Sequence, residues 1–343
     1  MQTIYTEKHK LRDAKTELYG GELVPPFECP VRAEHILQRV HQVDLGAVEA
    51  PDEFGLEQIL RVHDSAFIEF LQSCWEQWKA DGMQGEAIPS VWPGRSMPQN
   101  RVPDHIEGKM GYYCLAVETS ITDGTWEAAK ASANVALTAQ SKITGGAREA
   151  FGLCRPPGHH AATDAYGGYC FINNAAVSAQ AFIDQGAERV AILDVDFHHG
   201  NGTQEIFYNR SDVMFCSLHG DPREAFPHFL GYADENGAGD GEGFNFNFPL
   251  GPGTPYSEWA DALDAALTKV KNYSPDALIV SLGVDTFEND PISFFKLKSD
   301  DFSHYGARIA ALNLPTLFIM EGGYAVAEIG VNTVNVLTGF KGA

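Results

Sequence analysis

Two nearly uninterrupted apolar runs constrain the fold more than any other feature of this chain. Residues 190–195 read Val-Ala-Ile-Leu-Asp-Val, and residues 277–282 read Ala-Leu-Ile-Val-Ser-Leu. A strand that is covered on one face alternates apolar and polar residues, whereas a strand buried on both faces is apolar throughout. The two runs therefore predict a parallel sheet that lies between two layers of helices.

Segments with strand patterns and segments with helix patterns alternate along the 343 residues. Strands are expected at Thr3–Thr6, Ala150–Cys154, Arg189–Asp196, Val213–Leu218, Ala277–Asp285 and Pro315–Glu321. Helices are expected at Ala33–Val43, Leu56–Lys79, Thr125–Thr144, Asn173–Gln185, Tyr256–Asn272 and Asp300–Asn313. This alternation predicts an α/β fold class: one three-layer α/β/α domain over residues 1–343, with a mostly parallel central sheet.

Residues 81–112 break this alternation because they are rich in proline and glycine. A structureless stretch of this length inside a domain is usually a lid or an interaction loop, so we expect a loop insertion here. Its apolar residues Val91-Trp92-Pro93 are expected to pack on something. The sequence leaves open whether they pack on their own domain or on a neighbouring subunit.

Composition excludes some classes of function. The 46 acidic and 24 basic side chains give a net charge of −22, which argues against binding to nucleic acid or to an anionic membrane. A cationic substrate would be compatible with this charge. No apolar run approaches a membrane span, the start lacks a secretory signal, and the six cysteines are widely spaced without a C-x-x-C motif. We expect a reduced, cytoplasmic protein whose cysteines are mostly buried free thiols.

Polar side chains follow the two apolar runs. The first run leads into Asp194-Val-Asp196-Phe-His198, and the second ends in Gly283-Val-Asp285. The carboxyl ends of parallel strands meet at one edge of a sheet, and an extended chain would point Asp194, Asp196 and His198 to one side. Two carboxylates and an imidazole suit zinc or ferrous iron, with a position left open for water. The alternative is that these groups only cap loops.

Three more motifs contain candidate functional residues. They are Arg155-Pro-Pro-Gly-His159-His160, the aromatic segment 166–174, and Glu321-Gly-Gly-Tyr324 after the last strand. By themselves, the two histidines are ligands, acid–base groups or surface residues. A tyrosine after a turn more often packs in a core, so these motifs alone leave the chemistry open.

In this order, the motifs R-P-P-G-H-H, G-G-Y-C-F-I-N-N, D-V-D-F-H-H-G-N-G-T-Q, S-L-H, G-V-D and E-G-G-Y resemble the arginase–deacetylase superfamily. The resemblance is to its histone-deacetylase-like branch and covers roughly residues 20–335. Within that branch the chain is most similar to the bacterial acetylpolyamine amidohydrolases. That similarity lies in residues 15–27, in the 81–112 insertion and in residues 285–295.

The resemblance implies a set of roles at the site. Zinc would be bound by Asp196, His198 and Asp285, and Tyr324 would face it across the substrate carbonyl. His159 and His160 would be the acid–base pair, with His160 moving the proton and His159 kept charged through Asp194. A structural potassium or sodium ion would take Asp194, the Ser217 hydroxyl and the main-chain carbonyls of Asp196, His198 and Leu218.

The resemblance also implies a substrate class, acetylated polyamines such as acetylputrescine, acetylcadaverine and acetylspermidine. Acetyl-lysine in proteins or peptides is the alternative substrate, and a non-catalytic binder or a binuclear manganese ureohydrolase is disfavoured by the intact ligand pattern. The 81–112 loop is expected to form a homodimer contact and to narrow the channel. The implied substrate-binding residues are Tyr169, Phe226, Glu17, Glu107, Glu118, Gly168 and Ile292.

Two positions depart from relatives in that branch. Asn201 stands where some eukaryotic relatives pair the second histidine with an aspartate, which should lower the pKa of His160. Ile292 stands where the eukaryotic polyamine deacetylase has a glutamate. If this chain recognises a polyamine cation, other acids must do so, and Glu17, Glu107 and Glu118 are the candidates.

Overall fold

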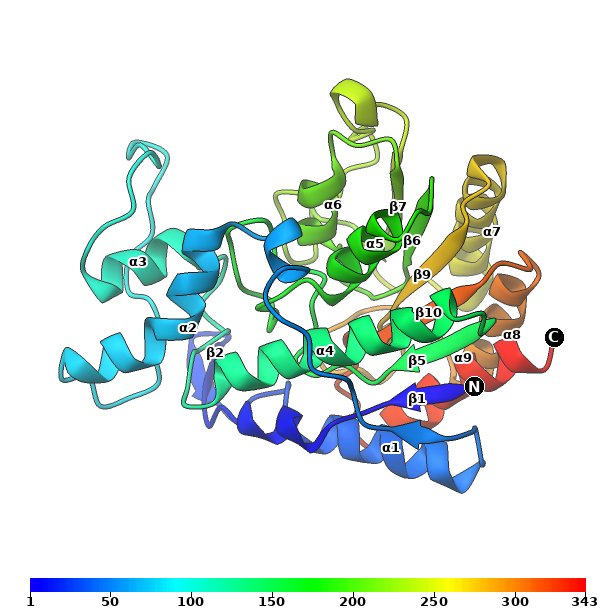
Figure 1. The fold of residues 1–343 in the computed structure, drawn as a ribbon, viewed down its shortest axis with the longest axis horizontal. Coiled ribbons are helices and arrows are strands. Elements are labelled where there is room, and N and C mark those ends of the chain that lie inside the picture. Colours follow the sequence, from blue (N-terminus) through cyan, green and yellow to red (C-terminus); the bar gives the residue numbers. More distant parts are fainter.

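Alternate residues of the central strands face two different cores. In β6 (Val190–Asp194), Val190 and Ile192 pack into one core, and Ala191 and Leu193 pack into the other. The computed structural model, which describes residues 1–343, therefore explains the continuous apolar run: this strand has no face in water. Helices cover both sides of the sheet (Figure 1).

The sheet has eight strands, and all neighbouring pairs are parallel. Their order is β4 (Val48–Glu49), β1 (Gln2–Ile4), β5 (Glu149–Gly152), β10 (Thr316–Met320), β9 (Ala277–Leu282), β6, β7 (Val213–Gly220) and β8 (Asn245–Leu250). This order brings the carboxyl ends of β5, β10, β9 and β6 next to one another. A separate hairpin consists of β2 (Glu17–Tyr19) and β3 (Glu22–Val24).

The helices divide between the two cores. The first core contains residues of α2 (Ser65–Ala80), α3 (Ile106–Tyr113), α4 (Thr125–Thr144), α5 (Asn174–Asp184) and α6 (Asn201–Phe207). The second contains residues of α1 (Val31–Gln42), α7 (Tyr256–Tyr273), α8 (Ser299–Ala310) and α9 (Ile329–Lys341). Three short 3₁₀ helices lie at η1 (Glu7–Leu11), η2 (Ile59–Arg61) and η3 (Gly239–Gly241). The predicted three-layer α/β/α fold class is confirmed.

The predicted elements all exist, but one helix prediction is wrong at its start. The expected helix Leu56–Lys79 is divided, because η2 ends at Arg61 and α2 begins only at Ser65. The Asp64 side chain sets that beginning by accepting hydrogen bonds from the N–H groups of Ala66 and Phe67. Seven elements were not predicted from the sequence: β2, β3, β4, β8, α3, α6 and α9.

The insertion at residues 81–112 is less irregular than expected, because its last part belongs to α3. The remainder, the cyan segment between α2 and α3, stands out from the sheet layers (Figure 1). Trp92 packs on the first core, and its indole N–H donates to the carbonyl of Cys114 over 2.9 Å. This residue therefore packs on its own chain, whereas Val91 and Met97 are exposed.

All six cysteines are free thiols, and five of them are buried. None of the helices combines the length and the apolar character that a bilayer span requires. The two chain termini lie near each other on the side of the molecule where β1 begins (Figure 1).

Candidate active site

Two carboxylates and an imidazole converge at the carboxyl edge of the sheet. Asp196 and His198 lie in the loop after β6, and Asp285 lies in the loop after the neighbouring strand β9. His198 Nδ1 is 3.3 Å from Asp196 Oδ1 and 3.0 Å from Asp285 Oδ2. All three side chains are buried, and their potential ligand atoms lie within 4.8 Å of one another.

The extended chain that would align Asp194 with this group is not present. Strand β6 ends at Asp194, and Asp196 and His198 are supplied by the irregular loop that follows. Asp194 instead uses Oδ1 to accept from the backbone N–H of Asp196 over 3.1 Å. It supports one of the three converging residues and is not a member of their group.

The electrostatics of the three residues fit a divalent cation. Burial and the nearby charge of Asp196 raise the pKa of Asp285 to about 8. Burial also opposes ionisation of Asp196, but His159 and His198 hold its pKa below the usual range. Two buried carboxylates this close cannot both ionise without a compensating cation. Carboxylate oxygens with an imidazole nitrogen are a donor set for zinc or iron.

His159 lies behind this group and is held by Asp194. Its Nδ1 is 2.9 Å from Asp194 Oδ2, and its Nε2 is 3.8 Å from Asp196 Oδ1. Burial disfavours a charged imidazole, but Asp194 and Asp196 together raise the pKa of His159 to about 10. The two carboxylates therefore favour the charged imidazole.

His160 has the opposite electrostatic character. Burial, the neighbouring His159 ring and His198 lower the pKa of His160 well below its ordinary value. The His159 and His160 ring centroids are 4.0 Å apart. His160 Nδ1 lies 2.6 Å from Asn201 Oδ1, so its partner is a neutral amide and not a carboxylate. His160 is therefore a neutral imidazole that can accept a proton.

Tyr324 follows β10, lines the same cavity as His198, and packs its ring on an arginine. The Arg32 guanidinium carbon is 4.8 Å from the Tyr324 ring centroid. Arg32 Nε donates to the carbonyl of Gly323 over 2.6 Å, and Nη2 donates to the carbonyl of Glu321 over 2.7 Å. The Tyr324 hydroxyl makes no hydrogen bond within the chain, although the residue is only 7% exposed, so the hydroxyl is available to a ligand in the cavity.

A cavity of about 340 Å³ leads to these residues. It is lined by Glu17, Leu18, Tyr19, Glu118, His160, Gly168, Tyr169, Phe197, His198, Glu224, Ala225, Phe226, His228, Ile292, Phe294 and Tyr324. At Gly168, whose φ is +55°, an added Cβ would lie 2.2 Å from His160 Cδ2. Only glycine allows the wall of the cavity to approach His160 this closely.

Two of the three predicted acids line the cavity. Glu17 is 1% exposed, and its Oε1 accepts from the Tyr169 hydroxyl over 2.9 Å. Glu118 Oε1 accepts from the backbone N–H of Gly168 over 2.8 Å. Glu107 is elsewhere, on α3, with Oε1 3.4 Å from the Ser90 hydroxyl, and it does not line this cavity.

The histone deacetylase domain model matches residues 26–340 of the chain. The chain belongs to the histone deacetylase family. It is 58% identical to acetylpolyamine amidohydrolase from Mycoplana ramosa over all of both chains. It is 57% identical to acetylpolyamine amidohydrolase 2 from Pseudomonas aeruginosa, covering all of this chain and 99% of the relative. The fold is similar to the crystal structure of acetylpolyamine aminohydrolase from Burkholderia pseudomallei, with a TM-score of 0.94, 37% identity, and coverage of 99% and 98% of the two chains.

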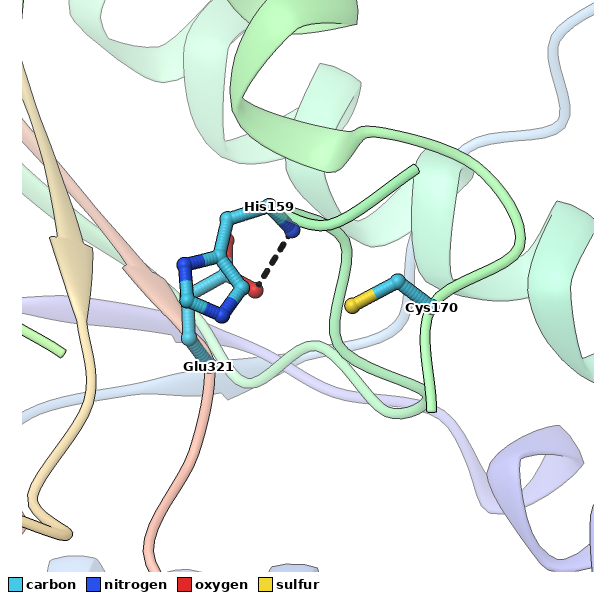
Figure 2. A group of neighbouring side chains, drawn as sticks. All are labelled: His159, Cys170 and Glu321. Carbon is cyan, nitrogen blue, oxygen red and sulfur yellow. Dashed lines mark hydrogen bonds between the residues drawn. The ribbon is translucent and has the colours of Figure 1, made fainter. Parts of the chain in front are cut away.

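This histone deacetylase family member has a second group of potential ligand side chains, His159, Cys170 and Glu321. Figure 2 shows the Glu321 carboxylate reaching the main chain of His159. Its Oε2 accepts from the N–H of His159 over 3.2 Å and from the N–H of Gly158 over 2.7 Å. Burial keeps the pKa of the Cys170 thiol far above its usual value. Glu321 therefore fixes the loop that carries the histidines, and the thiol is a poor ligand.

Four residues that line or support this site were not predicted from the sequence. Arg32 is a polar residue in an amphipathic helix, where nothing in the pattern distinguishes it from a solvated charge. Glu321 is part of the E-G-G-Y motif, which drew attention only to its glycines and tyrosine. Glu224 and His228 follow β7 in a segment without a recognisable motif.

Proposed function

We propose that this chain is a metal-dependent amidohydrolase that removes acetyl groups from acetylated polyamines such as acetylputrescine, acetylcadaverine and acetylspermidine. The observation that carries the proposal is the convergence of Asp196, Asp285 and His198, where His198 also lines the cavity that contains His160 and Tyr324. The similarity to relatives named acetylpolyamine amidohydrolase over their full length supports the substrate class.

Asp196, His198 and Asp285 would hold the metal, which we propose is zinc, with ferrous iron as the alternative. When bound, the ion would polarise the acetyl carbonyl and lower the pKa of the attacking water. The neutral His160 would accept the proton of that water and then donate it to the departing amine. The cationic His159 would stabilise the negative charge that develops nearby.

Tyr324 would donate a hydrogen bond to the oxygen of the acetyl group as that oxygen becomes an oxyanion. Its hydroxyl has no partner in the chain that would compete for this role. A donor of this kind is typically worth about 3–4 kcal/mol of transition-state stabilisation. Arg32 would keep the ring in position through its contacts with the Tyr324 face and the Gly323 carbonyl.

The walls of the cavity suit an alkyl chain that ends in a cation. Tyr169 and Phe226 would flank the methylene groups of the substrate. Glu17 and Glu118 would attract the distal ammonium, and their charges act across a cavity with largely aromatic walls, where screening is weaker than in water. Gly168 and Ile292 would limit the width of the channel.

We further propose that the protein is a homodimer and that the 81–112 insertion makes the contact. The support is that Val91, Met97 and Val102 are exposed on this protruding segment. In such a dimer, Glu107 would face the channel mouth of the partner. We also propose a structural potassium or sodium ion held by Asp194, the Ser217 hydroxyl and the main-chain carbonyls of Asp196, His198 and Leu218; Ser217 Oγ lies 2.8 Å from His219 Nδ1.

The test is a comparison of kcat/KM on N-acetylputrescine, N8-acetylspermidine and an acetyl-lysine peptide. The proposal predicts that the acetylated polyamines are turned over far faster than the peptide, because the narrow acidic cavity selects a small cation. A peptide that is the better substrate would instead assign the chain to protein deacetylation. No turnover of any acetamide would refute the amidohydrolase activity itself.

A further inference from the structure

Asp290 is a buried carboxylate to which the sequence motifs assign no role. It lies in the loop after β9, five residues beyond Asp285, and is 7% exposed. No lysine, arginine or histidine forms an ion pair with it. Its partners are three backbone N–H groups.

These three N–H groups lie on two loops, one after β9 and one after β10. Asp290 Oδ2 accepts from the N–H of Tyr324 over 2.7 Å and from that of Ala325 over 3.2 Å. Asp290 Oδ1 accepts from the N–H of Ile292 over 3.1 Å. One carboxylate therefore connects the backbone of the proposed oxyanion donor, Tyr324, with the backbone of a cavity-wall residue, Ile292.

The same two loops are joined a second time, nearer the strands. The N–H of Val284 donates to the carbonyl of Gly322 over 3.1 Å. Between the two connections lies Gly323, whose φ is +126° and where an added Cβ would lie 2.6 Å from Val284 Cγ2. The backbone conformation from Gly322 to Tyr324 is thus restricted at Gly323, and Asp290 fixes the end of this segment at Tyr324.

We propose that Asp290 is a positioning residue that fixes Tyr324 relative to the proposed metal ligand Asp285. The inference rests on the proposed role of Tyr324. Asp285 and Asp290 lie in the same short loop. The Asp290 carboxylate therefore fixes the position of the Tyr324 backbone relative to the loop that contains Asp285. Placement matters because a shift of about 1 Å in a reacting group can cost on the order of 100-fold in rate.

Three N–H donors at this position are better satisfied by a carboxylate than by a neutral amide. Burial raises the pKa of Asp290 to about 6, and the N–H groups of Tyr324, Ile292 and Ala325 act against that rise by stabilising the ionised form. An amide in its place has only one acceptor oxygen. Its NH₂ group would face an N–H donor, either at Ile292 or at Tyr324.

The test is a double-mutant cycle with Asp290→Asn and Tyr324→Phe, using kcat on N-acetylputrescine and bound metal per chain as the two measurements. We expect Asp290→Asn to lower kcat about tenfold or more in the parent chain, with metal content unchanged. In the Tyr324→Phe chain, we expect it to lower kcat by less than about twofold, because the hydroxyl that it positions is already gone. Glu288→Gln is the matched control: it removes a carboxylate from the same loop whose side chain makes no hydrogen bond, and kcat should stay at the parent value.

The inference would be overturned by a parental kcat for Asp290→Asn, by equal losses in both backgrounds, or by a loss of bound metal. A variant that does not fold, judged by circular dichroism, would assign Asp290 to stability and would also overturn it. Failure of the underlying function is seen separately. If Tyr324→Phe alone keeps parental turnover, the proposed role of Tyr324 is wrong, whatever Asp290→Asn does.

Discussion

The Tyr169 hydroxyl donates a hydrogen bond to Glu17 Oε1 over 2.9 Å, across 152 residues of sequence. The other oxygen of Glu17 accepts from the backbone N–H of Phe27 over 3.0 Å. The carboxylate is thus fixed by two donors and still lines the cavity. The Glu17 side chain is already ordered without a substrate, so little of its conformational entropy would be lost on binding.

This arrangement predicts a pH-dependent KM. Burial raises the pKa of Glu17 to about 7, so the carboxylate is mostly neutral at about pH 6 and mostly charged at about pH 8. We expect KM for N-acetylputrescine to fall as the pH rises through this range, because the ammonium of the substrate stays charged. In the Glu17→Gln chain, KM should be higher and nearly constant. Parallel pH profiles of KM for the two chains would exclude Glu17 from recognition of the amine.

Glu17 also predicts a change in stability with pH. Its pKa is higher in the folded chain than in the unfolded chain, so the folded chain holds this proton more tightly. The contribution of Glu17 to stability is therefore present below about pH 4.5 and is lost as the pH rises through about 7. We expect the Tm of the parent, relative to Glu17→Gln, to decrease over that interval. A difference in Tm that grows in the opposite direction would contradict the assigned pKa.

A carboxylate at position 201 should shift the acid limb of the rate profile. Asn201→Asp would give His160 an anionic partner at a contact that is now 2.6 Å, which raises the pKa of the imidazole. Because only neutral His160 accepts a proton, we expect the acid limb of kcat/KM to move to higher pH by about one unit or more. Asn201→Ala is the control, since it adds no charge and should not move the limb upward. An unmoved limb in Asn201→Asp would indicate that His160 is not the base.

Removal of the Tyr324 hydroxyl should slow the reaction without harming the fold. Tyr324→Phe deletes only an oxygen that has no partner in the chain, and we expect kcat to fall on the order of 10²–10³-fold with an unchanged Tm. Tyr305→Phe is a matched control, because the Tyr305 hydroxyl is also unpaired but is buried in the second core. Steady-state kinetics of the two variants distinguish the roles. Equal rates in both would remove Tyr324 from the chemistry.

The sheet and most of its helices were predictable because burial on two faces leaves a direct mark in the sequence, as at 190–195 and 277–282. Helix α9 was missed because Gly330 and Gly339 make its sequence a poor helix former. Both glycines are needed for packing: an added Cβ would lie 2.5 Å from the His35 carbonyl oxygen at one and 2.1 Å from that of Ser303 at the other. Such close helix contacts have no local sequence signal.

Site residues that belong to short sequence motifs could be predicted. Site residues that only folding brings together could not. The motifs contained Asp196, His198 and Asp285, but the residue that ends β6, Asp194, could not be separated from the group by spacing alone. Asp290 was missed because its partners are backbone N–H groups, two of them on another loop. Hydrogen bonds from backbone N–H groups depend on the backbone conformation and not on the identity of the partner side chain, so the sequence does not show them.

Substitution of a proposed metal ligand should affect metal binding before it affects anything else. We expect Asp196→Ala to bind less than about one tenth of the metal of the parent chain, since it removes an anionic oxygen from a three-residue donor set. Elemental analysis of purified protein gives the metal-to-chain ratio. Full occupancy in Asp196→Ala would exclude Asp196 as a ligand, even if its activity were low.

The most direct test of the account is turnover of N-acetylputrescine by the purified chain before chelation, after removal of all metal, and after addition of one equivalent of zinc or ferrous iron. The three converging residues Asp196, His198 and Asp285 predict that acetate release disappears with the metal and returns with one equivalent per chain. Acetate release that continues at the original rate in the metal-free chain would contradict the account.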